Sequence, residues 1–111
     1  MTAALGITGL GGGLDMAQGG WVYMMANKPH GMLYIGVTAY LASRVHQHRI
    51  DLGSAYCRRY GLKMLVFAEQ HETIQNAIAR EKMLKAWKRS WKDELIATIN
   101  PEWVDLYDQL N

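Results

Sequence analysis

Residues 21–36 read WVYMMANKPHGMLYIG, and they contain two strand-like segments joined by a short polar segment. The two ends of this stretch, residues 21–26 and 32–36, are rich in the aromatic and β-branched residues that favour strands, with methionines between them. The five residues between them, Asn-Lys-Pro-His-Gly, have the composition of a turn. We therefore predict a β-hairpin.

The hairpin places two tyrosines on one side of the predicted sheet. Side chains alternate along a strand, so Tyr23 lies on one face of its strand, and Tyr34 lies on the matching face of the partner strand. If Ala26 pairs with Gly31 across the turn, Tyr23 falls opposite Tyr34. Such a pair can be a simple aromatic contact that stabilises the sheet.

The rest of the chain predicts one small α+β domain. We expect a first helix at about residues 39–50 capped by Thr38, a third strand at 62–68, and a second helix at 74–89 capped by Thr73. Glu69 would follow the third strand. Ser90 with Asp93 then predicts another helix start, and Asn100-Pro101 begins a short last helix.

Two polar side chains share a face of the first predicted helix. Arg44 and His48 are four residues apart and follow soon after Gly36. Both can reach an anion beside the sheet, and Gly36 leaves room for a phosphate there. His46 and His71 lack comparable neighbours, and we expect them on the surface.

Glu81 is unusual because it lies on the apolar stripe of the second predicted helix, formed by Ile74, Ala77, Ile78 and Leu84. A carboxylate that faces a core is costly unless a cation is beside it. One alternative is a structural ion pair with Arg44. The other is a ligand for Mg²⁺ or Mn²⁺, which prefer oxygen donors.

Charge is distributed unevenly along the chain. Residues 44–92 hold eleven Lys and Arg against four acidic residues, a net charge of +7, whereas residues 93–111 hold five acidic residues and no Lys or Arg. A basic segment of this density suits a polyanionic partner, although such residues also simply solvate helix faces. We expect Arg80, Lys82, Lys85, Lys88 and Arg89 to project outward around Glu81, and we expect Trp87 and Trp91 to pack rather than to stack on bases.

The ordered set of segments resembles the signature of the GIY-YIG nuclease family, in its small, stand-alone, single-domain bacterial form. The family has a G-[IV]-Y segment, a Y-[IV]-G segment, then Arg and His on the first helix and Glu on a later one. Here the first segment is Gly20-Trp21-Val22-Tyr23, with Trp where the family usually has Gly, and the second is Tyr34-Ile35-Gly36. The resemblance runs from about residue 19 to residue 109.

The resemblance implies a three-stranded antiparallel sheet flanked by helices in the order β-β-α-β-α-α, with an extra short C-terminal helix. It also implies a metal-dependent endonuclease that hydrolyses phosphodiester bonds in DNA, with a role in repair or in processing DNA structures. Tyr34 would activate the attacking water, and Tyr23 would orient it. Arg44 would stabilise charge on the phosphate, His48 would hold the phosphate or relay a proton, and Glu81 would hold one Mg²⁺ or Mn²⁺ ion.

The partner implied is DNA, with RNA as an open alternative and no obligate protein partner evident. The residues that we expect to contact its phosphates are Arg49, Arg58, Arg59, Lys63, Lys82, Lys85 and Lys88. A catalytically silent nucleic-acid-binding module of the same fold is the alternative function. A single cysteine and no apolar run of about eighteen residues predict a cytoplasmic location and no membrane span.

The first fifteen residues differ in composition from the remainder. They contain five glycines and no periodic apolar pattern, which predicts a flexible Gly-rich extension over residues 1–15. The nuclease-like domain would then span residues 16–111.

Overall fold

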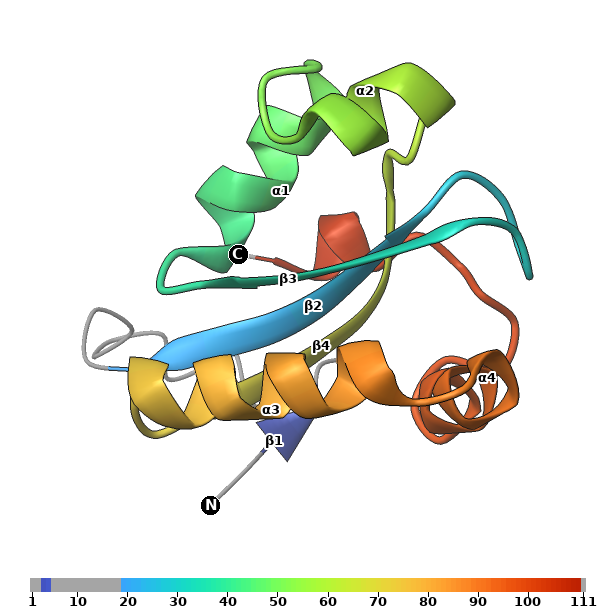
Figure 1. The fold of residues 1–111 in the computed structure, drawn as a ribbon. Helices are drawn as coiled ribbons and strands as arrows, with labels where there is room; N and C mark the ends of the chain where they lie inside the picture. Colours follow the sequence, from blue (N-terminus) through green and yellow to red (C-terminus); the bar gives the residue numbers. More distant parts are fainter. Residues whose placement is uncertain (1–2, 5–18, 111) are drawn as a thin grey trace.

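An antiparallel sheet lies between two layers of helices (Figure 1). The computed structural model describes residues 3–4 and 19–110. The strands are β1 (Ala3–Ala4), β2 (Gly20–Ala26), β3 (Leu33–Thr38) and β4 (Met64–His71), in the spatial order β1-β4-β2-β3. The helices are α1 (Leu41–Arg49), α2 (Ala55–Tyr60), α3 (Ile74–Ala86), α4 (Arg89–Ala97) and the 3₁₀ helix η3 (Leu106–Gln109).

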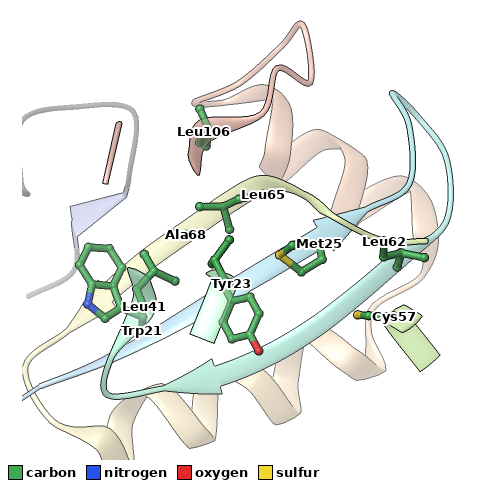
Figure 2. Packing of buried hydrophobic residues seen from close by; sticks show 10 residues of the cluster. Trp21, Tyr23, Met25, Leu41, Cys57, Leu62, Leu65, Ala68 and Leu106 are labelled. Atoms are coloured by element: carbon green, nitrogen blue, oxygen red, sulfur yellow. The ribbon is translucent and has the colours of Figure 1, made fainter. Parts of the chain in front are cut away.

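Alternation along β2 divides the core into two clusters, one on each face of the sheet. Tyr23 and its neighbours on the same face pack against Leu41 and Val45 of α1, Cys57 of α2 and Leu106 of η3 (Figure 2). Val22 and Met24 point the other way, into a cluster that includes residues of α3 and α4. Figure 1 shows this division, with α1 and α2 on one side of the sheet and α3 and α4 on the other.

The predicted fold class is confirmed. Strands β4, β2 and β3 form the expected three-stranded antiparallel sheet, and a short helix ends the described chain. In addition, Ala3 and Ala4 pair with Gln70 and Glu69 of β4. The flexibility expected for residues 1–15 otherwise concerns residues outside the described part of the chain.

The predicted register of the hairpin is wrong by two residues. Ala26 pairs with Leu33, so Tyr23 lies opposite Gly36 and not opposite Tyr34. The reason is a longer loop: the Asn27 side chain accepts a hydrogen bond from the Met32 amide, and Gly31 N–H donates to the Lys28 carbonyl. A shift of two residues preserves the faces, so both tyrosines still lie on the α1 side.

Several helix ends differ from the expected ones. Thr73 caps α3 as predicted, since its hydroxyl accepts from the Asn76 amide, but α3 ends at Ala86. Helix α1 begins at Leu41, and the Thr38 hydroxyl accepts from the Tyr40 amide in the preceding turn. The predicted Ser90 start is also wrong, because α4 begins at Arg89 without a side-chain cap.

We did not predict α2, and the last helix begins later in the chain than we predicted. The Ser54 hydroxyl caps α2 at its start, and Gly61 ends it in the left-handed conformation, with φ at 69°. After Asn100 the chain turns, and in this last described segment only η3 is helical; Trp103 and Leu106 pack on opposite faces of the sheet. No helix in the described residues is long and apolar enough to cross a membrane.

Candidate active site

A buried hydrogen bond between β2 and α1 forms the centre of the candidate site. Tyr23 Oη lies 2.8 Å from His48 Nε2, and both side chains are buried. The Tyr34 ring lies at an edge-on angle to His48, with 5.4 Å between ring centroids, and 6.3 Å from Tyr23. The three rings therefore form one cluster, on the face of the sheet that α1 covers.

Gly36 is needed because the Tyr23 phenol lies directly against it. A Cβ atom added at Gly36 would stand 2.5 Å from Tyr23 Oη and 2.6 Å from Cζ. The space that we expected a phosphate to use at this glycine is filled by Tyr23. Gly53 likewise lies directly against His48, since a Cβ atom added there would clash with His48 Nδ1.

Arg44 lies one helical turn before His48, and its charge acts on both members of the hydrogen-bonded pair. Burial, and then the Arg44 charge, lower the pKa of His48 below its ordinary value. Protonation of Nε2 would also remove the acceptor to which the Tyr23 hydroxyl can donate. His48 is therefore neutral near neutral pH.

The two tyrosines differ in their surroundings. Burial, followed by the proximity of Tyr34, raises the pKa of the Tyr23 phenol, and Arg44 opposes this only in part. Tyr23 therefore keeps its proton at any physiological pH. Tyr34 is only partly buried. The single cysteine is not a nucleophile here, because burial raises the pKa of the Cys57 thiol to about 11.

Glu81 lies on the helix that covers the opposite face. Its side chain is 14% exposed, and its Oε2 lies 2.9 Å from Lys85 Nζ. Among the described residues no ion pair joins Glu81 to Arg44, so that predicted alternative is not observed. The expected apolar stripe is also narrower: Ala77 and Leu84 are buried, but Ile78 is exposed.

The helix that carries Glu81 and the tyrosine cluster lie on opposite faces of the sheet. Strand β3, which carries Tyr34 and Gly36, is the outermost strand, and α3 packs against both β2 and β3. The structure thus brings Tyr23, Tyr34, Arg44 and His48 together on one face. Glu81 belongs to α3, and Figure 1 shows α3 on the opposite face of the sheet from α1.

The basic residues expected to contact phosphates fall into two groups, those already paired within the fold and those exposed to solvent. Arg49 is bound to Asp105 at 2.7 Å and lies over the Tyr107 ring, and Lys63 pairs with Asp51 at 3.5 Å. These two basic residues are engaged within the fold. The remaining candidates are exposed: Arg58 and Arg59 on α2, Lys82 and Lys85 on α3, and Lys88 just after it.

A charged cluster beside α3 was not anticipated. Strand β4 continues to His71, so Glu69 lies inside it, faces α3 and is nearly buried. Arg80 donates to both Glu69 oxygens at 2.9 and 3.2 Å, and His71 Nε2 lies 2.8 Å from Oε1. The expectations that Arg80 projects outward and that His71 lies on the surface are therefore wrong. The physical reason is the extra length of β4.

The sequence reading also missed two tyrosines of α2. Tyr56 stacks on Tyr34 with 6.3 Å between centroids, and Tyr60 follows at 5.0 Å from Tyr56. Ser54 and Gly61 are typical of the start and the end of a helix, and the four-residue spacing of the tyrosines places them on one face of it. This pattern could have predicted the row of rings. As expected, Trp87 packs within the fold, and its ring lies edge-on to Trp91. Trp91 itself is half exposed.

Comparison with known proteins places this chain in a family. The model of the GIY-YIG catalytic domain matches residues 19–94. The UPF0213 protein plu4503 of Photorhabdus laumondii is 31% identical over 81 residues, which cover 73% of this chain and 78% of that protein. A UPF0213 protein of Serratia proteamaculans is 30% identical over 77 residues, covering 69% and 76%. No solved structure gave a significant match.

Proposed function

Because the chain belongs to the GIY-YIG family, we propose that it is a metal-dependent endonuclease that hydrolyses phosphodiester bonds in DNA. The observation that carries this proposal is the cluster of Tyr23, Tyr34 and His48 beside Arg44. It combines two phenols in unlike surroundings, a neutral imidazole and a fixed positive charge. Repair or processing of DNA structures, within the cytoplasm, is the role that we propose for this activity.

The two phenols suit different tasks. Tyr23 is buried, keeps its proton and is held by His48, which fits a group that orients a water molecule and does not deprotonate it. Tyr34 is partly exposed on the same face. Two titratable groups whose environments differ in this way are a common basis for separate catalytic roles, and we assign the general base to Tyr34.

Arg44 and His48 serve the phosphate. The Arg44 guanidinium would stabilise negative charge that develops on the phosphoryl oxygens, which is usually the largest contribution in such sites. A neutral His48 can accept or pass on a proton through Nε2, where it meets Tyr23. Both roles use side chains from one face of α1.

Glu81 fits a site for Mg²⁺ or Mn²⁺ by the chemistry of its donor. It offers a carboxylate that is partly open to solvent, and its partner Lys85 is itself 56% exposed. Within residues 3–4 and 19–110, no three His, Cys, Asp or Glu side chains form a ready-made metal site. That agrees with Mg²⁺, which is commonly held by one or two carboxylates plus substrate phosphates and retains several waters. Once bound, the ion would polarise the scissile phosphate and stabilise the leaving oxygen.

One observation favours a second candidate, a catalytically silent nucleic-acid-binding module. Lys85 already neutralises Glu81, so the carboxylate has a cation without any metal. The two candidates differ in a simple requirement, because only the nuclease needs a divalent ion.

The test is incubation of the protein with labelled single-stranded, duplex, branched and nicked DNA, and with RNA, in the presence and absence of Mn²⁺. We expect cleavage of at least one DNA only with Mn²⁺, and its loss in Glu81→Gln. The matched control is Glu102→Gln, which removes an exposed carboxylate near the C-terminus and should cleave like the wild type. Binding without cleavage in every reaction would favour the silent module.

A further inference from the structure

A row of tyrosine rings leads from the candidate site to the surface. Tyr34 stacks on Tyr56 with the ring planes 28° apart, and Tyr56 contacts Tyr60 at 5.0 Å. The row therefore starts at the proposed general base on β3 and continues along α2. Nothing in the proposed chemistry requires Tyr56 or Tyr60.

The outer part of this row faces solvent. Tyr56 is 41% exposed and Tyr60 is 42% exposed, so both rings present area to solvent. A structural contact would explain the inner pair, since Tyr34 is partly buried. It does not explain why two neighbouring rings remain open side by side.

The charge around the row is positive. Arg58 and Arg59 lie between the two tyrosines in sequence and are exposed, and helix α2 contains no acidic residue. The Arg59 guanidinium lies over the Tyr60 ring at 5.4 Å. In the part of the chain that the structure describes, neither arginine has an ion-pair partner. Open aromatic rings beside unpaired arginines are the combination by which proteins hold single-stranded nucleic acid.

We propose that α2 is a stacking platform for an unpaired nucleobase, with Tyr56 and Tyr60 against the base and Arg58 and Arg59 against its phosphates. The base would be adjacent to the bond that is cleaved, because Tyr56 contacts Tyr34 directly. In a duplex both faces of a base are covered by its neighbours, so a duplex cannot use this platform without unstacking. The preferred substrate is therefore a polynucleotide with unpaired residues beside the scissile phosphate. This inference rests on the proposed nuclease function.

The first test needs only the wild-type protein. Binding is measured in EDTA, without cleavage, to a single-stranded DNA and to the same strand in which abasic spacers replace two adjacent nucleotides, so that the phosphates remain and the bases are lost. We expect the intact strand to bind on the order of ten-fold more tightly for each base stacked. Equal affinity for the intact and abasic strands would overturn the proposal.

The second test assigns the preference to α2. The Tyr56→Leu/Tyr60→Leu double variant should lose the discrimination between intact and abasic strands, whereas Tyr56→Phe/Tyr60→Phe, which keeps both rings, should retain it. The control is Tyr40→Leu, which removes an exposed tyrosine outside the row and should behave as the wild type. A preference that survives in the double leucine variant would contradict the assignment, and if that variant does not fold, the single variants Tyr56→Leu and Tyr60→Leu provide the same comparison.

Two further measurements distinguish failure of the stacking platform from failure of the proposed nuclease function. DNA and RNA strands of one sequence are compared, and the tighter binder identifies the source of the unpaired base. Cleavage is then followed with Mn²⁺. Equal cleavage of duplex and single-stranded DNA would refute the platform but leave the nuclease intact. A clear preference for intact strands without any cleavage would support the platform and refute the nuclease.

Discussion

Gly36→Ala should destabilise the protein by forcing the Tyr23 ring out of place. The added Cβ would stand 2.5 Å from Tyr23 Oη, 2.6 Å from Cζ and 2.9 Å from Cε1, roughly 1 Å inside ordinary contact. The ring has little freedom to move, since it is fully buried and hydrogen-bonded to His48. Overpacking of this kind costs about 1–3 kcal/mol in free energy of unfolding. For a domain of this size, that corresponds to a melting temperature lower by about 5–20 °C.

A double-mutant cycle with Tyr23→Leu isolates this contact. Leucine does not extend to Gly36, so Gly36→Ala should cost less than about 0.5 kcal/mol in the Tyr23→Leu background, giving a coupling energy of at least about 0.5 kcal/mol. Urea unfolding followed by tryptophan fluorescence supplies the four free energies, because Trp21 and Trp103 are buried. Cleavage should fall together with stability, since Tyr23 and His48 move apart.

The control variant for this cycle is Gly61→Ala. Its added Cβ would meet no atom within 4 Å, but its φ of 69° strains any residue other than glycine, so its cost should be about 1 kcal/mol in both backgrounds. If Gly36→Ala cost the same with and without the Tyr23 ring, or nothing in the wild type, the packing argument would be wrong.

Three further predictions concern charge. In Glu81→Gln, loss of the ion pair between the partly buried Glu81 and the exposed Lys85 should change stability by about 1 kcal/mol at most, while Mn²⁺-dependent cleavage falls by several orders of magnitude; a large drop in melting temperature with unchanged cleavage would contradict the metal assignment. Burial and the Arg44 charge lower the pKa of His48 in the folded protein, so the His48 imidazole of the unfolded chain binds a proton at a higher pH. Stability should therefore fall as pH decreases from about 6.5 towards the folded pKa. Melting curves of His48→Gln should lack this pH dependence. Affinity for DNA, measured at increasing salt, should fall with a log–log slope of about −0.9 per phosphate contact, and Arg58→Gln should reduce that slope by about one contact; a salt-independent affinity would exclude phosphate binding.

Strand periodicity was enough to predict the sheet and its faces, but not its register. A period of two assigns Tyr23 and Tyr34 to the same face whatever the loop length. The register depends on how many residues the loop takes up, which the Asn27 side chain decides by binding the Met32 amide. No pattern in the strands themselves contains that information.

The same distinction applies to the site. The four-residue spacing of Arg44 and His48 predicted that they share one face of α1, and in the structure the Arg44 charge contributes to the lowered pKa of His48. The surroundings of Glu81 were harder to predict, because they depend on the rotation of α3 about its axis. The Arg80–Glu69 contact joins α3 to β4 through residues that are 11 apart in sequence. The observed rotation of α3 leaves Ile78 exposed.

The attachment of α3 through Arg80 and Glu69 has a practical consequence. Arg80, which attaches α3 to the sheet, directly precedes Glu81 and makes its contacts without Glu81. The orientation of α3 and the proposed metal binding therefore depend on different side chains. We therefore expect that changing Glu81 alone gives an inactive protein with the helix still attached. Such a protein should hold an uncut strand long enough for a complex to be crystallised or cross-linked, and the bound strand would then be seen directly against α2.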